Sequence, residues 1–143
     1  NFDQLVLIGH SGGGTLAMLL APRIEQAQLL VTLSANLDID RWAALHDYNP
    51  LRGSLNPALQ APMVPALPQL HFAGSMDQNV PAELIRNVVR QHPRAELVVM
   101  DAVDHRCCWV ERWPQLLERI KREFPAPMSS TQSAKTESAG KVD

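Results

Sequence analysis

LVLIGHSGGGTLAMLL, at residues 5–20, passes from an apolar strand to an apolar helix through a short run of glycine, histidine and serine. The apolar run at residues 4–8 predicts a parallel strand buried on both faces. The apolar residues after the glycines predict a helix through about Leu20, before Pro22. The sharp turn between strand and helix would place Ser11 at its apex in a strained conformation, with its hydroxyl group clear of the fold.

Gly9 and Gly13 stand two residues before and two residues after Ser11. Side chains at these positions would collide in so tight a turn, so we interpret the two glycines as the space that the turn needs. The N–H group of Gly12 is expected to point at a reacting carbonyl, at the positive end of the helix dipole. The alternative is a phosphate-binding loop, but neither G-x-x-x-x-G-K-[ST] nor G-x-G-x-x-G is present.

The other predicted strands and helices alternate along the chain. Strands are predicted at residues 28–34, 69–73 and 96–100. Helices are predicted at residues 41–46, after Pro81, and over a last apolar face made of Trp113, Leu116, Leu117, Ile120 and Phe124. This alternation predicts an α/β fold, in which a parallel sheet of about four strands lies between two layers of helices.

Composition divides the chain further. Residues 38–68 are rich in proline and predict a small cap inside one domain that spans residues 1–126. Residues 127–143 are small and polar without apolar periodicity, which predicts a disordered tail.

Charge and apolar content argue against several classes of partner. The chain has 143 residues, a net charge of −2 and a pI of about 6.2, which do not favour nucleic acid or a membrane surface. No apolar run reaches the roughly 18 residues of a membrane span. The chain begins with Asn1 and shows no signal peptide, and we expect the true N-terminus to lie upstream.

Cys107 and Cys108 are the two cysteines of the chain and are adjacent. Neighbouring cysteines rarely pair, because the geometry strains the peptide between them. We therefore expect one buried cysteine beside one free thiol, or a bond from one of them to a cysteine in an upstream segment. No metal site is expected, since no CxxC spacing accompanies them.

Two polar residues follow predicted strands, at the edge of a parallel sheet where active sites lie. HFAGSMDQNVP places Asp77 after the third strand, and VVMDAVDHRCCW places His105 after the fourth. Ser11, Asp77 and His105 then follow in the order nucleophile, acid, base. The alternatives are a helix cap for Asp77 and a backbone-bonded structural role for His105.

Other residues have weaker claims to these roles. Asp101 and Asp104 are alternative acids, although Asp104 adjoins His105 in sequence and would face its ring with difficulty. The alternative bases are His10, His46, His71 and His92.

The elbow GHSGG, the acid loop HFAGSMDQNVP and the histidine loop VDHRCCW resemble, in this order, the C-terminal half of an α/β-hydrolase. The resemblance covers about residues 3–124. It implies Ser11 as nucleophile, Asp77 as acid and His105 as base, with Gly12 as one oxyanion donor and no cofactor. A complete member has about four strands before the elbow and a second oxyanion donor there. We therefore expect a fragment whose partner is the missing N-terminal half of the same domain.

Four further segments, SANLD, SLNP, LPQLHFAG and DHRCCW, are similar to a branch of uncharacterised bacterial hydrolases. Many members carry a lipoprotein-type export signal, which implies a periplasmic or membrane-anchored location and would suit a cysteine partner upstream. Without that signal, a cytoplasmic location is expected.

These features predict a serine hydrolase that acts on ester-like acyl bonds of a small molecule through an acyl-enzyme intermediate. One alternative is the same triad acting on peptide, thioester or lactone bonds. Another is a catalytically inactive remnant or a binding module on a hydrolase scaffold. The residues predicted to contact the acyl group, with plain packing as the alternative, are His10, Trp42, Leu45 and Tyr48.

Overall fold

A computed structural model describes residues 4–62 and 66–123 of the chain. The strands are β1 (Leu5–His10), β2 (Ala27–Leu33), β3 (Gln69–Gly74) and β4 (Ala95–Met100). The α-helices are α1 (Gly12–Leu20), α2 (Ile39–Leu45), α3 (Ala82–Val89) and α4 (Trp109–Glu123), and two short 3₁₀ helices are η1 (Ala21–Arg23) and η2 (Pro57–Leu59). The predicted polar tail and Phe124 lie outside the described residues.

The four strands form one parallel sheet in the order β1-β2-β3-β4. This confirms the predicted fold class, with strand bounds that shift by one or two residues. The central strands β2 and β3 are buried nearly throughout, as their apolar sequences require. The expectation that residues 4–8 are buried on both faces is wrong, since Leu5 and Ile8 are exposed. The reason is that β1 has no neighbour on its outer side among the described residues.

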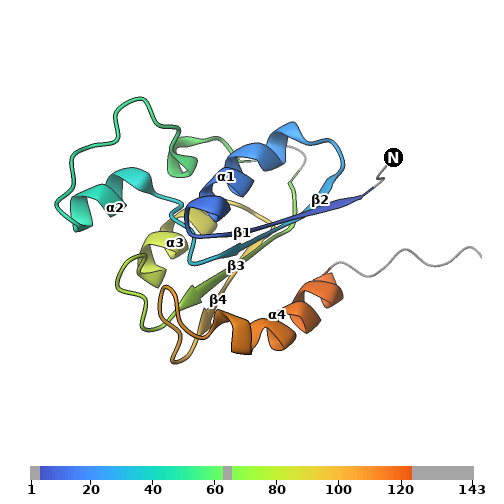
Figure 1. Ribbon diagram of the computed structural model, residues 1–143. Coiled ribbons are helices and arrows are strands. Elements are labelled where there is room, and N and C mark those ends of the chain that lie inside the picture. The colour runs from blue at the N-terminus through green and yellow to red at the C-terminus, as the bar shows by residue number, and fades with distance from the viewer. Residues whose placement is uncertain (1–3, 63–65, 124–143) are drawn as a thin grey trace, which may run out of the picture.

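Helices cover both faces of the sheet. One apolar cluster joins α1 and α3 to one face through Met18, Ile85 and Val88. A second cluster joins α4 to the other face, where Leu116 and Ile120 pack with Phe72. Figure 1 shows α4 on the side of the sheet opposite to α1 and α3. The result is the predicted three-layer arrangement.

The apolar face of α4 differs from the predicted one. Trp109, Leu116 and Ile120 are buried, whereas Trp113 remains 36% exposed. The helix begins at Trp109, so its buried stripe starts one turn earlier than the sequence pattern indicated. Pro114 lies inside the helix.

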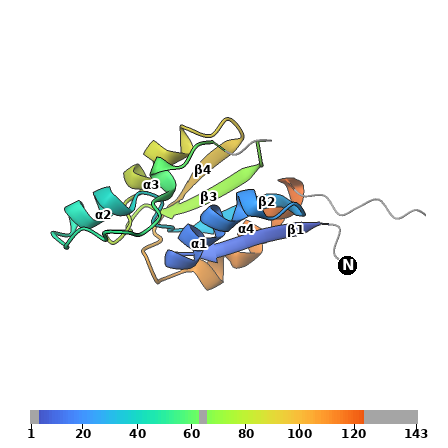
Figure 2. The same ribbon diagram turned by 90° about the horizontal axis from the view of Figure 1, so that it is seen from above.

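The proline-rich segment after β2 carries α2 and η2. Its turns are held by the buried side chain of Asn56, whose Oδ1 accepts the N–H groups of Ile39 at 3.1 Å and Ala58 at 3.2 Å. Asp38 caps α2 by accepting the N–H group of Arg41 at 3.2 Å. Figures 1 and 2 both place α2 beyond the carboxyl ends of the strands, which is the edge where the predicted site residues lie. The extent of the cap, the domain bounds and the tail stay predictions.

Candidate active site

Three loops at the carboxyl edge of the sheet bring a serine, a histidine and an aspartate into one hydrogen-bonded row. Ser11 follows β1, Asp77 follows β3 and His105 follows β4. Oγ of Ser11 lies 3.0 Å from Nε2 of His105, and Nδ1 of His105 lies 2.9 Å from Oδ2 of Asp77. Residues separated by up to 94 positions in sequence are thus in direct contact.

Ser11 has a positive φ of 52° together with ψ of −125°, a backbone conformation that residues with a Cβ rarely adopt. Its N–H group donates to the carbonyl of Leu33 at 2.9 Å, and its own carbonyl accepts from Gly14 and Thr15 in the first turn of α1. These bonds tie the turn to β2 on one side and to the helix on the other. A serine with a Cβ in this conformation is strained, and the surrounding bonds keep it there.

The glycines around Ser11 meet different surroundings. A Cβ on Gly9 would collide with the backbone of Gly13, so the space at Gly9 is required as predicted. The prediction is wrong for Gly13, because a Cβ there would meet nothing within 4 Å. The second crowded position is Gly14, where a Cβ would lie 2.5 Å from the Cβ of Ala35. The crowding arises where α1 crosses the chain after β2, and the turn pattern alone does not reveal that crossing.

Asp77 has a buried carboxylate that serves two partners. Its Oδ1 accepts the N–H groups of Asn79 at 2.9 Å and Val80 at 2.8 Å, while Oδ2 faces His105. Its side chain is fully buried, and that of His105 is 16% exposed. Asp77 thus holds its own loop and faces the histidine, but it does not cap the following helix, because α3 begins at Ala82 with Pro81 as N-cap and no side-chain cap bond.

The alternative acids have other partners. Asp104 turns its carboxylate into its own loop, where Oδ1 accepts the N–H groups of Cys107 at 2.6 Å and Arg106 at 2.8 Å. These two backbone bonds, led by the one from Cys107, lower the pKa of Asp104. Asp101 accepts the hydroxyl of Ser75 at 3.3 Å.

Cys107 and Cys108 form a disulfide with each other, which corrects the expectation of an unpaired couple or of a partner upstream. Side chains of neighbouring residues in extended chain point to opposite sides. Cys108 instead has φ of 79°, and this left-handed turn brings the two sulfur atoms to the same side.

A cavity of about 270 Å³ opens beside Ser11. The cavity lies between the start of α1, α2 and the chain that follows β2. One of its lining residues is Asn36, whose Oδ1 is buried without a hydrogen-bond partner in the described part of the chain. Its walls consist of Ser11, Gly12, Thr15, Leu16, Asn36, Ile39, Trp42, Leu51, Asn79 and Val80.

Two residues that line this cavity were not predicted as site residues, although the sequence contains patterns that point to them. Asn36 follows the carboxyl end of β2, so the strand-end rule that selected Asp77 also points to it. Thr15 lies one helical turn after Ser11 and therefore shares its face of α1. Both signals could have been used at the level of sequence.

Of the four residues predicted to contact substrate, Trp42 lines this cavity and the other three do not. His10 turns to the opposite side, where its Nε2–H donates to the backbone carbonyl of His105 at 2.9 Å. Leu45 is 54% exposed, and Tyr48 packs against the rings of Trp42 and His46. His10 lies at the end of β1 and Tyr48 lies after the end of α2, so nearness in sequence to Ser11 or Trp42 does not decide which side chain lines the cavity.

His71 and His92 lie away from Ser11. His71, in the middle of β3, is buried between the hydroxyl of Thr32, 2.7 Å from Nδ1, and Oε1 of Gln69, 3.0 Å from Nε2. Burial, with a smaller effect of His92, lowers the pKa of His71 to about 3. Burial also lowers the pKa of His92. Burial in the fold thus disfavours the charged form of both histidines.

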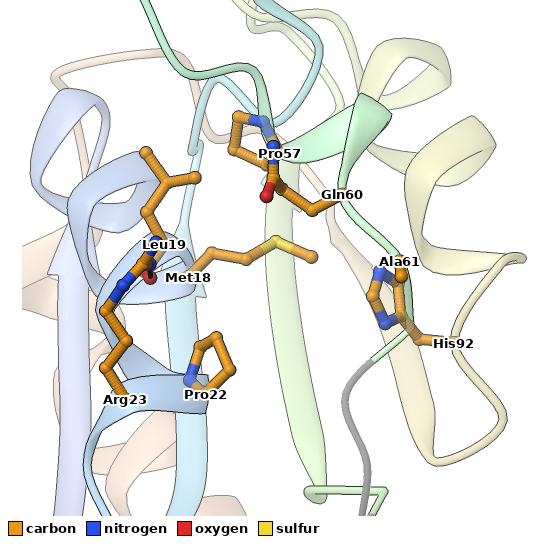
Figure 3. Close-up of a pocket in the computed structure, with 8 residues that line it drawn as sticks. All are labelled: Met18, Leu19, Pro22, Arg23, Pro57, Gln60, Ala61 and His92. Carbon is orange, nitrogen blue, oxygen red and sulfur yellow. Dashed lines mark hydrogen bonds between the residues drawn. The ribbon is translucent and has the colours of Figure 1, made fainter.

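A second cavity, of about 320 Å³, lies near the C-terminal end of α1. Figure 3 shows Met18 projecting from that helix toward the middle of the cavity, with Pro57 and His92 among the other lining residues. Ser11, Asp77 and His105 are not among its lining residues, so it is separate from the hydrogen-bonded row.

Two further observations concern partners. Within residues 4–62 and 66–123, no three His, Cys, Asp or Glu side chains are grouped to hold a metal ion. In the same residues, no helix combines the length and apolar character that crossing a membrane requires.

No family model matches the sequence, and no curated protein matches it. Solved structures do match its fold. An α/β-hydrolase enzyme from the metagenome of lagoon sediments at Mar Chica, Morocco, is 25% identical with a TM-score of 0.64, over 85% of this chain and 63% of that one. The esterase domain of a Rhodothermus marinus protein is 19% identical with a TM-score of 0.64, over 82% of this chain and 60% of that one.

A Pyrococcus furiosus esterase is 15% identical with a TM-score of 0.67, over 83% of this chain and 53% of that one. This chain therefore spans between 53% and 63% of the length of these three structures. The four-stranded parallel sheet and its flanking helices match their fold over most of the described residues. The chain is a partial α/β-hydrolase-fold domain.

Proposed function

We propose that this chain is part of a serine hydrolase that cleaves ester-like acyl bonds, with Ser11 as nucleophile. The observation that carries the proposal is the continuous row from Oγ of Ser11 through the ring of His105 to the carboxylate of Asp77. A serine hydroxyl is a weak nucleophile unless a base takes its proton, and a histidine needs a partner that holds the correct tautomer.

The reaction begins when Oγ of Ser11 attacks the acyl carbon while Nε2 of His105 takes the hydroxyl proton. The resulting imidazolium is stabilised by Asp77, which stays ionised. His105 then passes its proton to the leaving alcohol, and an acyl-enzyme remains on Ser11. Water, activated by the same histidine, releases the acid and restores the serine.

The negative charge on the acyl oxygen needs two hydrogen-bond donors. Gly12 supplies one, because it opens α1 and its N–H group has no acceptor inside the helix. We infer that the second donor comes from a further segment of the domain that pairs with the outer edge of β1. The exposed apolar side chains of Leu5 and Ile8 on that strand support this inference, since such an edge is normally covered.

The cavity beside Ser11 supports a small substrate with an apolar acyl group. Leu16, Ile39, Trp42 and Val80 offer apolar walls, and the volume of about 270 Å³ limits the length of the acyl chain. Esters are the proposed substrates, and peptides, thioesters and lactones are outcomes that the same triad chemistry allows.

The test is labelling of the chain with a fluorophosphonate, which reacts with an activated serine. The variants Ser11→Ala and His105→Gln should lose the label, whereas Ser54→Ala, an exposed serine in the proline-rich segment, should retain it. Circular dichroism of each variant shows that the fold is kept.

Absence of label from a folded chain would contradict the proposed function for this chain and would favour an inactive remnant or a binding module. The same measurement on a chain extended upstream would then separate a missing oxyanion donor from a true loss of function. If Ser11 takes the label, fresh unlabelled chain would next be offered p-nitrophenyl esters of increasing acyl length, to find the acyl length that the cavity accepts.

A further inference from the structure

The disulfide between Cys107 and Cys108 lies two residues after His105 and directly before α4. The chain contains no other cysteine, so this bond has no competing thiol partner within it. The disulfide belongs to the loop that positions the histidine, but none of the steps of the proposed hydrolysis uses it. Its position calls for an explanation beyond that reaction.

The loop is built around His105 by bonds on both sides of the disulfide. On one side, the carboxylate of Asp104 accepts the N–H group of Cys107, so the chain curls back across the histidine. On the other side, the carbonyl of Cys108 accepts the N–H group of Arg112, in the first turn of α4, at 3.1 Å. The disulfide therefore connects the turn that contains His105 to the beginning of a helix packed on the sheet.

The backbone of Cys108 is in the left-handed region, with φ of 79°, which is unfavourable for a residue with a Cβ. The bond between the two sulfur atoms closes a small ring that contains the peptide between the residues and restricts its backbone angles. When the bond is open, Cys108 is free to leave the left-handed region. The loop then loses one of the constraints that direct the ring of His105 toward Ser11.

We propose that Cys107–Cys108 is a thiol–disulfide exchange site whose reduction by a dithiol lowers the reactivity of Ser11 through the position of His105. The proposal rests on the proposed function of Ser11, His105 and Asp77. Cys108 is a positioning residue in this account, because it acts through the histidine loop and touches no reacting atom. Cys107 is exposed whereas Cys108 is half-buried, so the proposal takes Sγ of Cys107 as the atom that a reagent attacks.

The exchange proceeds in two displacements. A thiolate of the dithiol attacks Sγ of Cys107, the bond between the two cysteine sulfurs breaks, and the thiolate of Cys108 leaves and takes a proton. The second thiolate of the reagent then attacks the reagent sulfur bound to Cys107 and releases the second cysteine thiolate, which is also protonated. The reagent is oxidised to its cyclic disulfide, and the protein gains two electrons and two protons.

The experiment compares the oxidised chain with the same chain treated with dithiothreitol. Intact mass establishes the redox state, since reduction adds about 2 Da. We expect the rate of fluorophosphonate labelling at Ser11 to fall about tenfold on reduction and to recover on reoxidation, because misplacing a base lowers its efficiency. Equal labelling rates in the oxidised and the reduced chain would overturn the proposal.

Two double variants separate the backbone constraint at Cys108 from the chemistry of the sulfur atoms. The double variant Cys107→Ser/Cys108→Ser should label at the low rate and should not respond to dithiothreitol. The double variant Cys107→Ser/Cys108→Gly should label faster than the serine pair, because glycine adopts the left-handed conformation without a penalty. Equal rates in the two double variants would contradict the role assigned to the backbone of Cys108.

A readout without activity distinguishes failure of this proposal from failure of the proposed function. The ring resonance of His105, assigned by its loss in His105→Gln, should shift between the oxidised and reduced forms. An unlabelled Ser11 in both forms would contradict the hydrolase function, whereas an unchanged His105 resonance would overturn the exchange site. Alkylation that finds two free thiols in the oxidised preparation would also overturn it.

Discussion

Asp77 and His105 are joined by a contact of 2.9 Å between Oδ2 and Nδ1, and the other oxygen of the same carboxylate is held by two backbone N–H groups. The loop after β3 therefore sets the rotation of the Asp77 carboxylate independently of its contact with His105. Asp77 and His105 lie in loops that follow different strands, β3 and β4, so each loop can be perturbed separately. This arrangement gives the most direct test of the proposed mechanism.

Asp77→Asn should lower the rate of Ser11 labelling by about 10³- to 10⁴-fold, with little change in unfolding by urea. The amide oxygen can still accept from Asn79 and Val80, but the NH₂ group cannot accept a hydrogen bond from Nδ1–H of His105. Asp101→Asn is the matched control, since Asp101 is exposed and bonds to Ser75. Equal losses in the two variants would show that the effect is not specific to the contact with His105.

Two glycine substitutions in the turn around Ser11 should change the free energy of unfolding in opposite directions. Gly9→Ala should destabilise the fold by about 1–3 kcal/mol, because the new Cβ meets the backbone of Gly13. Gly13→Ala should stabilise it by about 0.5–1 kcal/mol, since the position is open and alanine favours the helix. Urea unfolding of both variants checks the pair, and a destabilising Gly13→Ala would contradict the packing described around Ser11.

Acid should destabilise the fold before the carboxylates titrate. The pKa of His71 is about 3 in the fold and 6.5 without it, so unfolding takes up a proton between these values. The stability that the fold gains from keeping His71 neutral is fully present above pH 6.5 and is lost as the pH falls toward 3. The loss of unfolding free energy between pH 6.5 and 5 is about 2 kcal/mol. Urea midpoints measured across that range test the direction.

His71→Gln is the control for that titration, because an amide can hydrogen-bond but does not titrate. We expect a shallower loss of stability between pH 6.5 and 5 in this variant. His92, whose pKa is also lowered by burial, contributes in the same direction and remains in the variant. An identical pH slope in both proteins would exclude His71 as the source.

The acyl preference should follow the size of the cavity beside Ser11. Leu16 lines that cavity yet is 61% exposed, so Leu16→Trp should narrow the cavity with little cost in stability. We expect the ratio of kcat/KM for hexanoyl over acetyl p-nitrophenyl esters to fall by at least about tenfold. Leu45→Trp, which adds the same ring to an exposed position outside the cavity, should leave the ratio unchanged.

Local patterns in the amino-acid sequence predicted the alternation of strands and helices and the strands that Ser11, Asp77 and His105 follow. Apolar runs and glycine turns are local signals, because burial on both faces and tight turns restrict residue type at each position. Strand ends in a parallel sheet meet at one edge, so the sequence also predicted that these three residues would share it.

The neighbours that each side chain meets depend on the packing of the folded chain. Gly14 is crowded by Ala35 across two elements, Trp42 lines the cavity while Leu45 faces solvent, and Cys108 turns its sulfur toward Cys107. These outcomes depend on how helices cross the sheet and on backbone angles in loops. Such angles are set by contacts between residues distant in sequence, and a local pattern carries no record of them.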